Sequence, residues 1–173
     1  NALPGAALDA DADTAARVQF WQDGGYSVYY LNTTGGWTRI SGNAAADKME
    51  AGTGFWLTLP ARAATEAVYL QGELLTCVQS NALDTGFGLF SLACTTNCTL
   101  GGLDFSGAYA GARPTLGDQV LIPDGTGAGY TAYYYGKKRG TASATWLDGG
   151  LNDATGVALP AGRAFWFKRV GTT

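Results

Sequence analysis

An internal repeat is the feature that most constrains how this chain of 173 residues can fold. Residues 25–30 read GYSVYY, and residues 129–134 read GYTAYY. An apolar stretch that ends in Asp-Gly precedes each of these two segments, and a single tryptophan, Trp37 or Trp146, follows each segment. An Ala-Gly-x-x-Phe-Trp motif then ends each copy. Because several motifs recur in the same order, we predict an internal duplication.

Each repeat has the pattern of β-strands. Tyr26, Val28 and Tyr30 alternate with their neighbours at the two-residue period of a strand. The Asp-Gly pairs between apolar runs favour hairpin turns, which need a positive φ. We therefore predict an all-β protein of two tandem, homologous, small modules that resemble β-sandwiches or barrels. The predicted modules span residues 1–78 and 79–173.

The two repeats are bounded differently. The segment GFGLFSL, residues 86–92, precedes the second repeat, while a long strand candidate, residues 66–75, follows only the first. We therefore expect the first module to lack its first strand and the second module to lack its last. An incomplete sheet accepts a strand from another chain, and such a head-to-tail contact builds a filament. The residues predicted at these assembly edges are Leu3, Leu8, Val68, Leu70, Phe87, Leu89 and Phe167.

Two alternatives to incomplete modules remain open. In the first alternative, the chain is a proteolytic fragment of a longer tandem array. In the second, both modules share the strands of residues 66–92. Neither alternative leaves a strand missing from the native fold.

The aromatic residues suggest contacts outside a single sheet face. Successive strand residues point to opposite faces, so one face cannot bury every ring. Large rigid rings anchor protein interfaces, which favours assembly. Rows of rings also stack on sugars, so a carbohydrate-binding or adhesion module of a secreted protein is the alternative. The predicted aromatic contacts are Tyr29, Trp37, Trp56, Tyr134, Trp146 and Trp166.

Composition argues against several classes of function. The chain has no histidine, which excludes Ser-His-Asp and Cys-His nucleophiles and histidine-ligated metals. A net charge of −3 offers no basic surface for nucleic acid. No apolar run approaches the roughly 18 residues of a membrane helix. Charged residues make up only 14%, which favours a packed extracellular assembly. Because the sequence offers no convincing pair of carboxylates and no histidine base, we do not expect an enzyme.

Three cysteines, Cys77, Cys94 and Cys98, are the candidates for a disulfide. Three cysteines permit one bridge with one thiol left over. Cys94 and Cys98 would close a small loop, and Cys77 with either of them a longer one. The sequence leaves the pairing open.

An acidic segment, Asp9, Asp11 and Asp13, starts like a calcium-binding loop. An EF-hand loop also needs Gly at its sixth position and Glu at its twelfth, where this chain has Thr14 and Phe20. A solvated acidic loop is therefore the main interpretation. A looser structural calcium site is the alternative, and no other cofactor is expected.

The second repeat carries motifs that resemble a known group of proteins. The segments at residues 87–92, 118–121, 129–133 and 160–165, with the intervening Leu-Asp loop, form a series of aromatic and glycine motifs. This series resembles β-repeat modules of secreted bacterial cell-surface proteins, including those of Verrucomicrobia and Planctomycetes. The resemblance implies export and a surface role and no catalytic residue. We expect an extracellular structural subunit of a filament, sheath or surface layer, with copies of itself as the main partner and glycans as the alternative one.

Overall fold

The chain forms two compact units, Asn1–Leu74 and Leu75–Thr173, in a computed structural model. The structure describes residues 9–22, 24–42, 52–60, 85–92, 98–105, 107–125, 129–138, 140–159 and 161–171. In these ranges the regular structure consists of antiparallel strands and two short 3-10 turns, which confirms the all-β prediction. The predicted module boundary between residues 78 and 79 lies outside the described residues.

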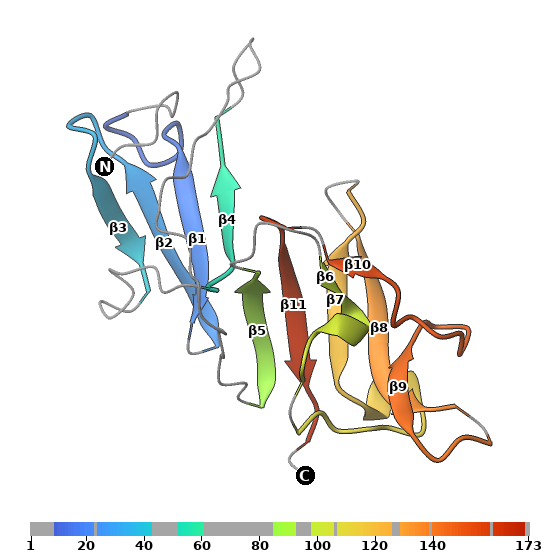
Figure 1. The fold of residues 1–173 in the computed structure, drawn as a ribbon. Helices are drawn as coiled ribbons and strands as arrows, with labels where there is room; N and C mark the ends of the chain where they lie inside the picture. The colour runs from blue at the N-terminus through green and yellow to red at the C-terminus, as the bar shows by residue number, and fades with distance from the viewer. Residues whose placement is uncertain are drawn as a thin grey trace. The chain divides into compact units, whose positions relative to one another are not determined.

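Unit 1 contains a four-stranded antiparallel sheet in the order β3-β2-β1-β4 (Figure 1). The hairpin that contains residues 25–30 forms the centre of this sheet. Gly24 in its turn has a φ of 78°, the positive value that such a turn requires. The strands are β1 (Arg17–Gln22), β2 (Gly25–Leu31), β3 (Trp37–Ser41) and β4 (Phe55–Thr58).

The core of unit 1 lies on one face of this sheet. Strand alternation places Val18 and Phe20 on that face, where they meet Tyr29 of β2. The rings of Phe20 and Tyr29 lie edge to face, with 5.8 Å between centroids. The partly buried residues packed against these three are Trp37, Phe55 and Leu57.

Unit 2 contains a five-stranded antiparallel sheet in the order β5-β11-β7-β8-β9 and a two-stranded pair, β10-β6 (Figure 1). The sheet strands are β5 (Gly86–Ser91), β7 (Gln119–Pro123), β8 (Tyr130–Lys137), β9 (Ala144–Leu147) and β11 (Ala164–Arg169). The remaining elements are β6 (Cys98–Thr99), η2 (Leu100–Gly102), η3 (Pro114–Leu116) and β10 (Ala158–Leu159).

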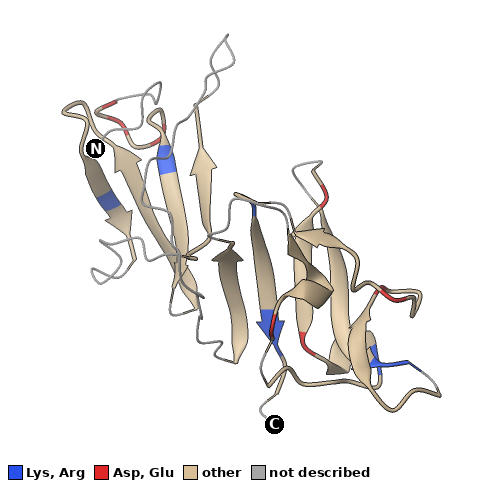
Figure 2. Ribbon diagram, viewed as in Figure 1, with Lys and Arg blue, Asp and Glu red and all other residues tan. Residues whose placement is uncertain are grey.

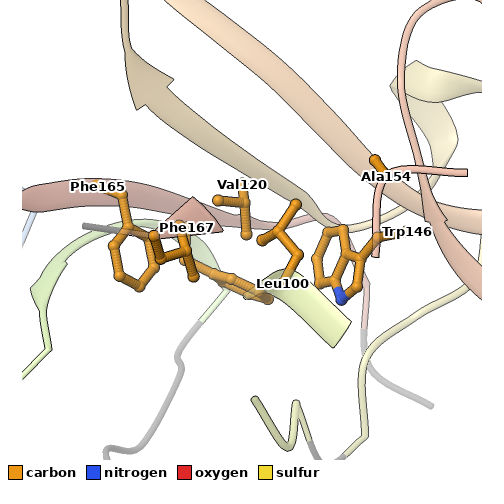
Figure 3. Close-up of a cluster of buried hydrophobic side chains, with 7 residues drawn as sticks. Leu100, Val120, Trp146, Ala154, Phe165 and Phe167 are labelled. Atoms are coloured by element: carbon orange, nitrogen blue, oxygen red, sulfur yellow. The ribbon is translucent and has the colours of Figure 1, made fainter. Parts of the chain in front are cut away.

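The larger core of the described chain lies in unit 2, where β10 and η2 contribute residues that pack against the sheet (Figure 3). Leu100 of η2 and Leu159 of β10 are almost fully buried against Val120 and Phe167 of the sheet. The chain therefore closes the sheet face with residues from short connecting elements. The buried cluster consists of Leu100, Val120, Trp146, Ala154, Leu159, Phe165 and Phe167.

Strand order is the same in both units over four strands. The order β3-β2-β1-β4 of unit 1 corresponds to β9-β8-β7-β11 of unit 2. Unit 2 has one further strand, β5, which pairs with the outer edge of β11. Among the described residues, no strand pairs with the equivalent edge of β4.

Register is also the same at the repeated motifs. In each hairpin one tyrosine pairs with a valine of the first strand. The tryptophan of each Phe-Trp motif pairs with the residue after that valine, and each lone tryptophan pairs with the residue two positions after that tyrosine. These pairs are Val18↔Tyr29 and Val120↔Tyr133, Gln19↔Trp56 and Leu121↔Trp166, and Leu31↔Trp37 and Tyr135↔Trp146.

A backbone hydrogen bond recurs at matching positions as well. The N–H of Leu31 donates to the carbonyl of Ala16 at 2.9 Å, and the N–H of Tyr135 donates to the carbonyl of Asp118 at 2.8 Å. In the connection between β7 and β8, Gly125 likewise has a positive φ, of 82°. The glycine of each Asp-Gly pair thus has the predicted positive φ, although the connection from Pro123 to Tyr130 is longer than the one from Gln22 to Gly25.

Candidate functional site

Strand β5 is an edge strand of the unit 2 sheet and carries two of the predicted assembly residues. Phe87 is 49% exposed, while Leu89 is 4% exposed. The strand has no charged residue (Figure 2). Natural edge strands usually carry charges or proline that discourage pairing with another chain. β5 lacks both, so its edge is suited to strand addition.

The remaining predicted edge residues fall into two groups. Leu3, Leu8, Val68 and Leu70 lie outside the described residues. Phe167 is described, and its predicted place at an edge is wrong. Strand β11 pairs with β5 on one side and β7 on the other, so Phe167 lies in the sheet interior and is 2% exposed.

The predicted aromatic contacts are mostly buried inside their own units. Four of the six, Tyr29, Tyr134, Trp146 and Trp166, are 9% exposed or less, which corrects the expectation that they face a partner. Trp146 lies against Tyr135 and Phe105, whose centroids are 5.3 and 4.9 Å away. Trp37 and Trp56 are half-buried.

A different set of rings is exposed. Tyr26 and Tyr130 occupy matching positions at the hairpin end of β2 and β8, at 39% and 44% exposure. The Tyr130 hydroxyl accepts a hydrogen bond from Nε1 of Trp166 at 3.3 Å. The sequence signal was available for Tyr26, which closely follows the Asp-Gly pair, whereas Tyr130 lies five residues after Gly125. Phe87 and Tyr109 are the other exposed rings of the described chain.

The acidic segment of unit 1 is a hydrogen-bonded turn. Oδ1 of Asp9 accepts from the N–H of Asp11, and Oδ1 of Asp11 accepts from the N–H of Asp13. Oδ2 of Asp9 also accepts from the hydroxyl of Thr14 at 2.7 Å, and Arg17 approaches Asp13 at 3.4 Å. Among the described residues, no group of three or more acidic or cysteine side chains is arranged to hold a metal ion. The carboxylates therefore stabilise the turn.

One of the three cysteines is described. Cys98 lies in β6 and is half-buried. Cys77 and Cys94 lie outside the described residues. No disulfide is found in the part of the chain that the structure describes, and the pairing stays a prediction.

Unit 2 has a hollow of about 250 Å³ beside its core, between η2, the segment that follows it, and the strands β8 and β9. Three aromatic rings, two threonines and one aspartate are among the side chains that line it. The sequence alone does not predict this hollow, because its walls come from segments far apart in the chain. The lining residues are Leu100, Gly101, Leu103, Asp104, Phe105, Tyr135, Ala144, Thr145, Trp146 and Thr155.

A second acidic turn follows β9. The side chain and backbone of Asn152 donate to Asp148, as does the N–H of Gly150, and these bonds lower the pKa of Asp148 from 3.8. The N–H and hydroxyl of Thr155 likewise lower the pKa of Asp153. These hydrogen bonds stabilise the loop of residues 148–155, and Thr155 of this loop lines the hollow.

This turn should remain intact in moderately acidic solution. Because the folded pKa of Asp148 is lowered, its contribution to stability is present above the unfolded pKa and is lost as the pH falls through the folded one. We expect the NMR amide shifts of Gly150 and Asn152 to titrate with a midpoint below 3.8. Asn152→Ala should raise that midpoint and leave the midpoint seen at Thr155 in place. A wild-type midpoint at or above 3.8 would contradict the assignment.

Comparison of the chain with protein-family profiles, curated proteins and solved structures finds no match in any of the three. Among the described residues, no helix has the length and apolar character needed to cross a bilayer.

Proposed function

We propose that this chain is an extracellular structural protein made of two homologous β-modules, which assembles into a filament, sheath or surface layer. The common strand order and the matching register at the repeated motifs support the duplication. Two unrelated sheets would not be expected to share registers at the same motif residues. The proposal includes no catalytic residue.

The observation that carries the proposal is the difference between β4 and β11. These strands carry the same Phe-Trp motif, and β11 has β5 at its outer edge. No described strand takes that place beside β4. A sheet edge exposes N–H and C=O groups that form a template for another strand. We infer that β5 of another copy of the chain pairs with β4.

Such a contact joins different surfaces of two copies. A heterologous contact of this kind produces a filament or array, rather than a two-fold dimer, when its rotation does not close into a ring. The absence of charge from β5 and β4 favours it, because no charged group has to lose its hydration. Extracellular placement is supported by the low share of charged residues and by the resemblance to secreted surface modules.

The first test is the mass and form of the protein at micromolar concentration. Light scattering should show large species, and electron microscopy should show regular filaments or sheets. A monodisperse particle of 17.9 kDa would overturn the proposal.

A pair of substitutions then tests the role of β5. Phe87→Glu should prevent assembly, because it places a charge on the edge strand while Lys168 lies directly opposite and compensates the charge within the sheet. Leu116→Glu is the matched control, since Leu116 is equally exposed, at 50%, but lies in η3 and not in a sheet. Assembly by Phe87→Glu at the wild-type level, measured by light scattering, would exclude β5 as the contact.

A further inference from the structure

We propose that the outer face of the unit 1 sheet, which is the face opposite the buried cluster of that unit, binds a neutral glycan chain. The site is a sheet face and not a sheet edge, so it is separate from the strand contact proposed for β4. The proposal depends on the exposure of the side chains on this face, on the groups that it combines and on its charge. The residues that define the outer face are Arg17, Gln19, Trp21, Tyr26 and Trp56.

Strand alternation and register place these side chains together. The core residues of β1 alternate with three residues that point to the opposite face, Arg17, Gln19 and Trp21. Directly opposed residues of antiparallel strands lie on the same face. Tyr26 of β2 lies opposite Trp21 and therefore shares its face. Trp56 of β4 lies opposite Gln19 in the same way.

The side chains of the outer face are accessible from solvent. Tyr26 is 39% exposed, and the side chain of Arg17 is 30% exposed. Gln19, Trp21 and Trp56 are half-buried. The rings of Trp21 and Tyr26 meet edge to face with 4.9 Å between centroids, so each limits the movement of the other. A ligand on this face therefore meets rings that are already positioned, which lowers the entropy cost of binding.

The outer face combines aromatic carbon with hydrogen-bonding groups. Gln19 stands between Arg17 and Trp21 on β1, and successive side chains on one face of a strand are about 7 Å apart. The amide of Gln19 both donates and accepts hydrogen bonds. A sugar ring has an apolar C–H face that packs on aromatic carbon, and its hydroxyls need donors and acceptors beside that carbon. A glycan chain presents both kinds of surface along its length.

The guanidinium of Arg17 keeps donors for such hydroxyls. Its Nη1 lies 3.4 Å from Oδ1 of the exposed Asp13. Its Nε is buried, with no hydrogen-bond partner in the part of the chain that the structure describes. A guanidinium has five N–H groups, so the Nη atoms retain donors beyond the one directed at Asp13.

The charge of the face favours a neutral ligand. The four strands of unit 1 contain no acidic residue and two arginines (Figure 2). Arg39 lies opposite the core residue Tyr29, so Arg17 is the charged residue that these strands place on the outer face. Asp13 already pairs with it, and the acidic segment that ends at Asp13 would repel a polyanion. A neutral chain has no charged group that must lose its hydration.

The corresponding face of unit 2 lacks this combination. The matched register places Leu121 where unit 1 has Gln19, and Pro123 where unit 1 has Trp21. The amide beside the motif tryptophan is thus absent from unit 2. We therefore assign glycan binding to unit 1 alone.

The test uses the full chain and defined oligosaccharides. Isothermal titration calorimetry with cellohexaose, chitohexaose, xylohexaose and mannohexaose should show binding of at least one. Tyr26→Ala should weaken that binding roughly tenfold, because it removes an exposed ring of the face. Tyr130→Ala is the matched control, since Tyr130 occupies the same position of the second hairpin and is 44% exposed. Gln19→Ala, which removes the amide and no ring, should also weaken binding.

Each outcome decides the proposal. Weaker binding by Tyr26→Ala and Gln19→Ala, with Tyr130→Ala at the wild-type affinity, supports the site. Absence of binding for all four oligosaccharides overturns it, as does equal weakening by Tyr130→Ala. Tighter binding of polygalacturonate than of any neutral chain, or binding of hexalysine alone, also overturns it, because the ligand is then an anion or a basic peptide. Light scattering measures assembly separately, so failure here does not affect the proposed structural function.

Discussion

Asp118→Ala is expected to destabilise unit 2 severely. The side chain is completely buried and joins two distant segments. Its Oδ2 accepts from the N–H of Tyr109 at 2.9 Å, and its Oδ1 accepts from the N–H of Val170 at 2.8 Å. Removing the carboxylate leaves both N–H groups without this acceptor. Hydrogen bonds to charged groups contribute about 1.5–3 kcal/mol each, so we expect the two lost bonds to cost roughly 3–6 kcal/mol.

The measurement is urea unfolding followed by tryptophan fluorescence and circular dichroism. Asp153→Ala is a suitable control, because Asp153 also accepts two hydrogen bonds but lies in an exposed turn. Its loss should be much smaller, since water replaces the missing acceptor. Equal unfolding midpoints for the two variants would show that the buried carboxylate does not hold these segments together.

The hairpins could be predicted from sequence because their determinants are local. Alternation in residues 25–30 and the Asp-Gly turn act over a few residues, and both hairpins formed as expected. The long segment at 66–75 lies outside the described residues, so its predicted strand remains a prediction.

Burial of the aromatic residues could not be predicted in the same way. Alternation tells which residues share a face, but not whether other elements cover that face. Trp146 is buried because Phe105 and Leu100, from a connection before the sheet's central strands, pack on it. Phe167 was expected at an edge because its strand is the last in the sequence. It is central because β5, much earlier in the chain, pairs beside it.

Asp118 was missed for a related reason. In sequence it stands between Gly117 and a strand, which is where a turn residue is expected. Its partners, Tyr109 and Val170, come from segments that only the folded sheet brings together. The hollow likewise depends on long-range packing. Sequence therefore predicted the hairpin strands, the Phe-Trp strands and β5, whereas β3, β6, β9, β10 and the site required the pairing of distant segments.

Phe167→Ala is the second change expected to have a large effect. Phe167 lies in β11 between two strands, and its ring stacks on Phe105 with 5.5 Å between centroids. Replacing a buried phenylalanine by alanine typically costs about 3–5 kcal/mol, so unit 2 should lose that much stability. Urea unfolding in dilute solution should show the loss.

Phe87→Ala is the matched control on the neighbouring strand. Phe87 is 49% exposed, and substitutions at such surface positions usually change stability by about 0.5 kcal/mol or less. Similar losses for the two variants would contradict the central place of β11. If Phe167→Ala instead separates unfolding into two transitions, with the earlier one reported by near-UV signals of Trp146 and Trp166, unit 1 folds without unit 2. Independent folding of this kind is expected because each unit has its own sheet and its own buried cluster, and it would be consistent with the proposed duplication.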